Sequence, residues 1–322
     1  MRHAITAVQR ILAAQLREEA DELARALPAA IAGDVRGVHR ARVAARRLSE
    51  ALPIARAALD EDHDRGLRRD VRRMRRALGG TRELDVARTM LAQEALDRGW
   101  AAALVEKVDA RCAAGRGAAR GHLRRRLAHL EPDELPKRLK HLADELERAR
   151  PSARGEALLA TRLRTRARNF GRVLAATGTL YSPEQLHAAR IGGKKLRYTL
   201  ELARTIARLP VSNVVRDLRA AQDLLGGLRD LQMLQRQIAA VAADPATNPA
   251  TMRVLDDWHR ELDAACRERH AAFVQMLPAL EHFAESLAAE LPLRLVRARP
   301  HRMAAMTSRR QARSRRQAAS GE

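Results

Sequence analysis

The sequence predicts an all-α protein made of two pseudo-symmetric helical bundles. Apolar residues in its clearest segments recur three and four positions apart, the spacing of one helix face. Aromatic residues make up only 2% of the 322 residues although apolar residues reach 46%, so we expect a core of Leu, Ala, Val and Ile in closely packed helices. An internal repeat at an offset of 148 positions divides the chain into two halves, and no alternating strand pattern occurs.

Prolines and glycines separate the helices expected in the first half. Proline lacks a backbone N–H and clashes with the preceding turn, so it ends or kinks a helix. The acidic turn of residues 60–64 is expected to begin a helix rather than to bind a metal ion, because carboxylates stabilise a helix N-terminus. The expected helices are 4–27, ended near Pro28; one after Gly33-Asp34 that Pro53 kinks or ends; 65–78, broken by Gly79-Gly80; 81–96; 100–130; and a shorter helix ending at Arg150.

A boundary between the halves is expected at residues 151–155, followed by a helix over 156–176. Ser182, Pro183 and Gln185 mark a further helix start, with an N-cap, a proline at the first helical position and a capping box. Residues 292–322 are rich in arginine and cannot bury a core, so they are expected to be disordered. The remaining helices are expected up to about 209, stopped by Pro210; over 211–225, followed by Gly226-Gly227; over 228–243; and over 250–290, interrupted at Pro278.

One segment occurs twice and carries the clearest functional signal. Both copies follow the pattern His-x-x-Arg-x-x-x-basic-basic-Leu, and residues 35–49 and 185–200 contain no acid. At roughly 100° per residue, the histidine and the first two basic positions share one helix face, opposite a face of Leu and Ala. The aligned residues are His39 with His187, Arg42 with Arg190, Arg46 with Lys194 and Arg47 with Lys195, and Arg197 adds a cation to the second copy.

The repeated cationic face predicts an anion-binding site. A charged helix face is most often only a solvated surface, but solvation does not require the same cations in the same register. A solvated face would also tolerate glutamates that form i,i+4 pairs with the cations. Because these faces contain no glutamate, their cations repel one another unless an anion binds. The helix after each copy is expected to extend the site, with Arg69, Arg72 and Arg76 in the first half and Arg216 and Arg219 in the second.

The overall charge limits the classes of partner. The formal net charge is +22, which implies a polyanion: nucleic acid, an anionic membrane surface or polyphosphate. Cys112 and Cys266 fit no metal or redox spacing and are expected to be inert thiols in a reducing compartment. The N-terminus does not follow the signal-peptide pattern and no run of 18 apolar residues occurs, so a cytoplasmic protein without membrane insertion is expected.

The repeated motif resembles the signature of CHAD domains, an all-helical family known to bind inorganic polyphosphate. A second repeated motif strengthens the resemblance, because Leu78-Gly79-Gly80-Thr81-Arg82-Glu83-Leu84-Asp85 returns as Leu225-Gly226-Gly227-Leu228-Arg229-Asp230-Leu231-Gln232. The resemblance covers about residues 1–291, with one repeat in 1–150 and the other in 151–291. It implies a pseudo-twofold arrangement in which both cationic faces line one shared basic channel or groove.

The chain departs from the family pattern at three positions. Glu50 stands where the second copy has Tyr198, and Glu83 and Gln232 replace acids that are more often Asp in the family. The anion face is unaffected, but the ion pairs around the second motif are expected to differ. Asp85 and the neighbourhood of Asp230 are interpreted as structural partners that hold arginines in place, not as catalytic groups.

The expected function is non-catalytic binding of inorganic polyphosphate, with recruitment of the protein to polyphosphate granules. Arginine binds phosphate bidentately and lysine acts as a point charge, so no catalytic residue, metal ion or cofactor is needed. Gly192-Gly193-Lys194-Lys195 lacks the spacing and the preceding strand of a phosphate loop. Histidine phosphotransfer from His39 or His187 stays open in principle, although no carboxylate is placed to orient either imidazole.

The alternative is a non-specific nucleic-acid-binding protein, because phosphate contacts alone supply most non-specific affinity. The two Trp, two Tyr and three Phe residues are too scattered for a base-stacking platform. The tail is compatible with nucleic-acid binding whatever the folded part does. A scaffold for granule assembly is a third class, which differs only in its partners. Competition between polyphosphate and DNA at matched charge separates the first two.

Overall fold

The computed structural model describes residues 6–59, 65–128, 133–207 and 212–297, and within these ranges all regular structure is helical. This confirms the predicted all-α fold class. None of the helices in these ranges has the length and hydropathy needed to cross a membrane. The helices are α1 (Ala7–Ala32), α2 (Val35–Ala58), α3 (Arg65–Ala77), α4 (Gly79–Arg98), α5 (Ala102–Ala128), α6 (Glu134–Arg148), α7 (Arg154–Ala176), α8 (Pro183–Ala207), α9 (Ser212–Ala242) and α10 (Pro249–Arg297).

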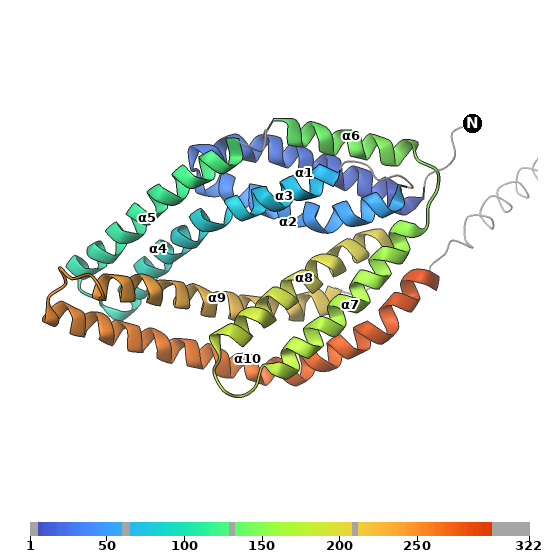
Figure 1. Ribbon diagram of the computed structural model, residues 1–322. Helices are drawn as coiled ribbons and strands as arrows, with labels where there is room; N and C mark the ends of the chain where they lie inside the picture. The colour runs from blue at the N-terminus through green and yellow to red at the C-terminus, as the bar shows by residue number, and fades with distance from the viewer. Residues whose placement is uncertain (1–5, 60–64, 129–132, 208–211, 298–322) are drawn as a thin grey trace, which may run out of the picture.

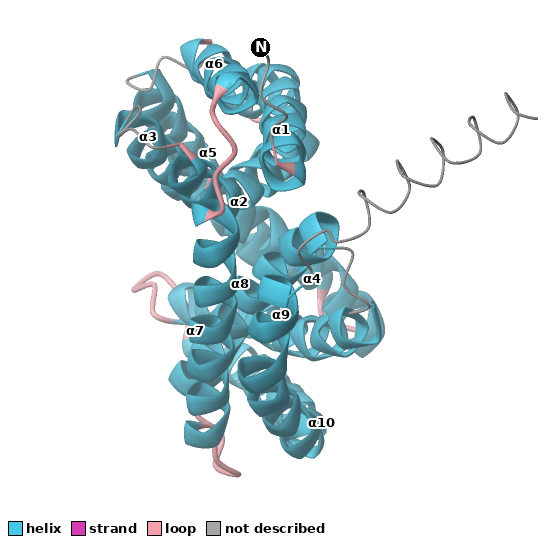
Figure 2. Cartoon of the chain, turned by 90° about the vertical axis from the view of Figure 1, so that its right-hand side faces the viewer, coloured by secondary structure: helices cyan, strands magenta, loops and turns pink. Residues whose placement is uncertain are grey.

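The helices of the two halves follow one another in the same order (Figure 1). α7 corresponds to α1, and α8 begins 148 residues after α2, the offset of the sequence repeat. α9 covers the region equivalent to α3 and α4 together, and α10 covers the region equivalent to α5 and α6 together. In Figure 2, α1, α3, α5 and α6 lie above α7, α8 and α10. Contacts of α2 with α7 and α8 join the halves, and the buried apolar side chains form one continuous core.

A tight turn between α1 and α2 sets the direction of the first motif helix. Gly33 has a φ of 88°, a left-handed conformation that glycine adopts without strain. Its N–H donates to the carbonyls of Ala29 and Ala30. Asp34 then caps α2 by accepting from the N–H of Gly37 at 2.5 Å, satisfying one of the unpaired donors of the helix start. The chain therefore reverses at once, and α2 returns along α1.

A glycine pair brings the second motif helix close to α7. A Cβ atom at Gly192 or Gly193 would lie 3.3 Å from the ring of Phe170, tighter than nine in ten such contacts. Phe170 is only 1% exposed, so the ring has no room to move away. The pair therefore serves helix packing inside a continuous α8, and Lys194 follows it directly.

Helices continue through four sites at which the sequence predicted an end or an interruption. A proline inside a helix costs about 3 kcal/mol. Leu27, Leu52 and Ile54, which flank two of the prolines, are at most 2% exposed, and burying such a side chain contributes about 1.5–3 kcal/mol. Core packing therefore outweighs the local penalty. The continuing helices are α1 through Pro28, α2 through Pro53, α9 through Gly226-Gly227 and α10 through Pro278.

Two sequence predictions fall partly or wholly on residues that the structure does not describe. α10 extends to Arg297, so its last turns occupy the start of the segment expected to be disordered. The rest of that segment, from residue 298 onward, lies outside the described residues, and so does the acidic turn of residues 60–64.

A pair of tryptophans joins the turn between α4 and α5 to the last helix. The rings of Trp100, between α4 and α5, and Trp258, on α10, are stacked with centroids 4.2 Å apart and planes 6° from parallel. Trp100 Nε1 also donates to Glu261 Oε2 at 2.9 Å. Both rings are less than 10% exposed. This contact, together with the packing of α4 and α5 on α9, holds the halves together at a second place, away from α2 and α7.

A candidate anion-binding cavity

A cavity of about 500 Å³, here called the basic cavity, lies between α2, α4, α8 and α9. This volume is within the usual range of small-molecule sites. Because α2 and α8 are the two motif helices, both copies of the repeat contribute to one cavity. Its polar lining consists of His39, Arg42 and Arg46 from α2; Glu83 from α4; His187, Arg190, Lys194 and Arg197 from α8; and Arg219, Gln222, Asp223, Arg229 and Asp230 from α9.

The basic cavity has an excess of positive charge. Six arginines and one lysine face three carboxylates, so four positive charges have no carboxylate in the lining when the lysine is protonated and the two histidines are neutral. Crowded like charges oppose the compact state unless an anion enters. Among the described residues, no Phe, Tyr or Trp lines the cavity. The lining therefore offers many donors to phosphate oxygens and no stacking surface to a nucleobase.

Burial and mutual repulsion lower the pKa of several of these bases. The pKa of Lys194 falls from 10.5 to about 7, chiefly through burial and then through the charges of Arg190 and Arg46. Burial also lowers the pKa of Arg190. The pKa of His187 is lowered by burial and by nearby Arg229. A bound anion acts in the opposite direction, because it favours the charged form of each base.

Four buried nitrogen atoms of the lining have no hydrogen-bond partner among the described residues. They are Nδ1 of His187, Nε of Arg190, Nε of Arg197 and Nε2 of Gln222. A buried polar group left unpaired costs about 1–3 kcal/mol, so such atoms are uncommon. These four are among only nine unpaired buried side-chain atoms in the described part of the chain. Their clustering indicates a site that an acceptor-rich ligand completes.

The α2 side of the basic cavity is more firmly anchored than the α8 side. Arg42 Nη1 donates to the Leu78 carbonyl at 2.8 Å, at the point where the helix is interrupted between α3 and α4. Arg46 Nη1 donates to the Tyr198 hydroxyl at 3.3 Å. α9 continues through the equivalent glycine pair, so this break exists only in the first half. The two motif copies therefore present their cations differently, with anchored arginines on α2 and unpaired nitrogens on α8.

The structure brings eight of the fourteen predicted site residues together in this lining and leaves six out of it. The eight come from both motif helices and from α9, which supports the expectation of one shared site. They are His39, Arg42, Arg46, His187, Arg190, Lys194, Arg197 and Arg219. The six are Arg47, Arg69, Arg72, Arg76, Lys195 and Arg216.

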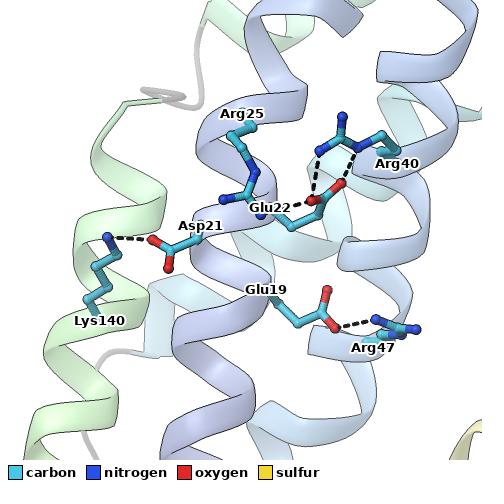
Figure 3. Close-up of polar contacts among 7 residues, drawn as sticks. All are labelled: Glu19, Asp21, Glu22, Arg25, Arg40, Arg47 and Lys140. Carbon is cyan, nitrogen blue, oxygen red and sulfur yellow. Dashed lines mark hydrogen bonds and ion pairs between the residues drawn. The ribbon is translucent and has the colours of Figure 1, made fainter.

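Arg47 and Lys195 are left out because each follows a cavity residue by one position, which turns its side chain roughly 100° around the helix. Arg47 instead pairs with the buried carboxylate of Glu19 on α1, with an N–O distance of 2.9 Å. Figure 3 shows that α1 carboxylates hold two α2 arginines in this way, since Glu22 also contacts Arg40. Lys195 is exposed to solvent.

The expectation that the helix after the first motif adds cations to the site is not met by the geometry. Arg69, Arg72 and Arg76 are exposed on α3, and α3 packs against α2, α4, α5 and α6. In the second half, Arg219 reaches the cavity, but Arg216 is exposed and lies beside Asp217 at 3.3 Å. The periodicity of a helix identifies its polar face but not the neighbour which that face meets.

Several lining residues were not among the predicted site residues. Arg229 adds a cation, Gln222 adds an unpaired amide, and Glu83, Asp223 and Asp230 supply the three carboxylates. For Arg229 and Asp230 a signal existed, because both belong to the repeated Leu-Gly-Gly motif that was interpreted as structural. Gln222 and Asp223 carry no such signal, since they become neighbours of the motif helices only through the packing of α9 on α8.

Two acids outside the basic cavity form ion pairs with arginines, and one of these pairs was expected from the sequence. Asp85 accepts from Arg116 Nε at 2.5 Å, as expected of an acid that holds an arginine in place. Glu50, on α2, contacts both Arg162 and Arg166 of α7, so this departure from the family pattern gives two arginines at the junction of the halves a shared carboxylate partner. The described residues include no group of three or more His, Cys, Asp or Glu side chains placed to hold a metal ion.

Comparisons with known proteins agree on the fold. The family model described as CHAD domain matches residues 14–239. The crystal structure of the CHAD domain from the plant Ricinus communis has a TM-score of 0.60 and 24% identity, covering 86% of this chain and 93% of that one. PptA from Streptomyces chartreusis has a TM-score of 0.55 and 21% identity, covering 86% and 99%. No curated protein matches the chain.

Proposed function

The chain belongs to the CHAD domain family, which is associated with polyphosphate binding, and from this premise we propose that it binds inorganic polyphosphate in the basic cavity. One observation carries the proposal: cations from both motif copies converge in a single space, together with unpaired buried nitrogens from α8 and α9. Polyphosphate is a linear polyanion that presents only acceptor oxygens. Arginine and lysine donors are its natural partners.

The proposed binding involves no chemical step. Positioning of a polyanion needs only donors, whereas hydrolysis or phosphoryl transfer needs an acid–base pair or a metal ion to activate a nucleophile. We expect no release of phosphate from polyphosphate in the presence of Mg²⁺. Release that is abolished by His39→Ala or His187→Ala would replace this proposal with an enzymatic one.

A titration with two charge-matched variants tests the proposal. In the cavity variant, Arg46→Glu is combined with Arg190→Glu. In the control variant, Arg69→Glu is combined with Arg72→Glu on exposed α3, so the net charge changes equally. Each charge-assisted hydrogen bond contributes about 1.5–3 kcal/mol, so losing two predicts at least about 100-fold weaker binding of long polyphosphate by the cavity variant. The affinity of the control variant should fall only a few-fold, because its changed charges act on the ligand from a longer distance and are screened by salt.

The same titration distinguishes polyphosphate binding from general polyanion binding. Duplex DNA is compared with long and short polyphosphate at near-physiological salt, where several phosphate contacts release counterions together. DNA should bind more weakly than polyphosphate, and its affinity should fall by the same factor in the two variants. If DNA binds as tightly as polyphosphate, and the two variants weaken both ligands alike, the non-specific nucleic-acid-binding function replaces the proposed one.

Recruitment to polyphosphate granules would follow from such binding. A fluorescent fusion of the wild-type chain should concentrate at granules, whereas the cavity variant should spread evenly and the α3 control should behave as wild type. An even distribution of all three proteins would count against recruitment while leaving the binding proposal intact.

A further inference from the structure

Lys194 differs from the other lysines of this chain in its surroundings. The chain has five lysines. Lys107 donates to Thr247 at 3.1 Å, Lys137 pairs with Glu134 at 2.7 Å and Lys140 pairs with Asp21 at 2.7 Å, while Lys195 is exposed. Lys194 alone lines the basic cavity, and it makes no hydrogen bond or ion pair within the described part of the chain.

Burial, and after it the arginines that face Lys194, keep its amine partly neutral against the opposite effect of nearby carboxylates. α2 contributes Arg42 and Arg46, and α8 contributes Arg190 and Arg197. The opposing wall from α4 and α9 supplies Arg219 and Arg229 together with the carboxylates of Glu83, Asp223 and Asp230. With its pKa at about 7, roughly half of the Lys194 side chains are neutral at pH 7, against about one in 3,000 for an ordinary lysine. A neutral amine is a nucleophile, whereas an ammonium group is not.

We propose that Lys194 is a modification site for acyl phosphates, small molecules in which a phosphate group is joined to an activated acyl group. The cationic lining that suits a polyphosphate unit also suits the phosphate end of such a molecule, and it would hold the acyl carbon beside the amine. Binding converts an encounter in solution into a reaction between neighbours.

The reaction is a simple acyl transfer. The lone pair of Lys194 Nζ attacks the acyl carbon, and a carbon–nitrogen bond forms. The carbon–oxygen bond to phosphate then breaks, inorganic phosphate leaves with the electron pair, and one proton of the amine passes to water. The product is an amide, which has no charge. The modified cavity therefore has one cation fewer and should bind polyanions more weakly.

Competition between the two ligands connects the modification to polyphosphate, and this part of the inference rests on the proposed function. A polyphosphate chain in the basic cavity would exclude the acyl phosphate and would also favour the protonated, unreactive amine. Chain binding should therefore protect Lys194, and acylation should in turn weaken chain binding.

The test is site-resolved mass spectrometry of the intact wild-type protein after incubation with acetyl phosphate at neutral pH. A protease that cleaves after Glu releases residues 185–201 as one peptide, which contains both Lys194 and Lys195. Fragment spectra then compare the two lysines directly. Compared with an ordinary lysine, the neutral fraction of Lys194 is larger by on the order of 1,000-fold, and its lower basicity reduces its nucleophilicity by tens-fold. We therefore expect Lys194 to be acetylated at least about tenfold faster than Lys195.

A second reagent and a competitor complete the design. Acetic anhydride, which has no phosphate, should show a weaker preference for Lys194, and excess inorganic phosphate should slow the reaction of acetyl phosphate at Lys194 alone. Equal rates at the two lysines, or the same preference with both reagents, would overturn the inference. If Lys194 reacts as expected but long polyphosphate neither protects it nor binds in the titration, the modification site stands and the proposed function fails.

Discussion

The affinity for long polyphosphate should fall as the pH rises above 7, because Lys194 must gain a proton when the chain binds. In the free protein its pKa is about 7, and a bound polyanion raises it toward its ordinary value. A base whose pKa is raised by the ligand strengthens binding below the free-state pKa, and this gain is lost as the pH rises toward the bound-state pKa. The pKa of free His187 is also lowered, so its contribution belongs to a lower pH range.

The size of the effect follows from proton linkage. Uptake of one proton changes the binding free energy by up to about 1.4 kcal/mol per pH unit. If the pKa of Lys194 returns to its ordinary value in the complex, the affinity falls about tenfold between pH 6 and pH 8 and about 100-fold between pH 6 and pH 9. Smaller shifts on binding give smaller losses, so these values are upper bounds.

Calorimetry of the wild type, Lys194→Arg and Lys195→Arg measures this dependence. Long chains are used because terminal phosphates titrate near pH 6 and are few in a long chain. Buffers of different ionisation enthalpy report proton uptake directly, which should approach one proton per site at pH 8. Lys194→Arg should remove both the uptake and the slope above pH 7, and Lys195→Arg should keep them. An unchanged slope in Lys194→Arg would refute the role given to this side chain.

Three further outcomes follow from the same geometry. Reversing the charge of both α2 arginines of the basic cavity, Arg42 and Arg46, should weaken the binding of long polyphosphate about as strongly as reversing the α8 pair Arg190 and Lys194. In either case a chain that spans one shared site loses an intramolecular contact. Calorimetry that finds unchanged affinity at half the stoichiometry would show two independent sites. Glu83→Gln should raise the affinity a few-fold, most clearly at low salt, because it removes a carboxylate that opposes the ligand; a titration at two salt concentrations checks this, and no change at low salt would argue against it. Lys194→Met should raise the Tm of the unliganded protein by a few degrees and weaken the binding of polyphosphate, because it removes a crowded cation from the basic cavity. A lower Tm in thermal denaturation would contradict this.

Sequence patterns identified the fold class and most of the cavity because those features depend on helix periodicity. The motif copies predicted which residues share a face of α2 and of α8. The same reasoning failed where packing overrides local preference, as when α1 continues through Pro28 beside buried Leu27. The penalty of a proline is local and visible in a sequence, whereas the burial that offsets it depends on residues far away in the chain.

The predicted site residues that lie outside the basic cavity show a second limit. Arg72 and Arg190 both belong to basic helix faces, but the basic face of α3 is exposed to solvent whereas α8 packs against α2 and α9. Only the arrangement of the helices decides between them. Arg229 illustrates the reverse case, since it stands in a motif whose repetition was visible but whose position opposite α8 was not. A single sequence thus predicts the faces of helices with more success than the partners of those faces.

The stacked pair of Trp100 and Trp258 gives this protein an internal reporter of its own shape. The chain contains only these two tryptophans, and they belong to different halves, with ring centroids 4.2 Å apart. Near-ultraviolet circular dichroism is sensitive to the fixed packing of such rings. Any ligand that moves α10 relative to the turn between α4 and α5 should therefore change the signal without an added label. The spectrum of the wild-type protein would then distinguish a ligand that binds without moving the helices from one that draws the two halves together.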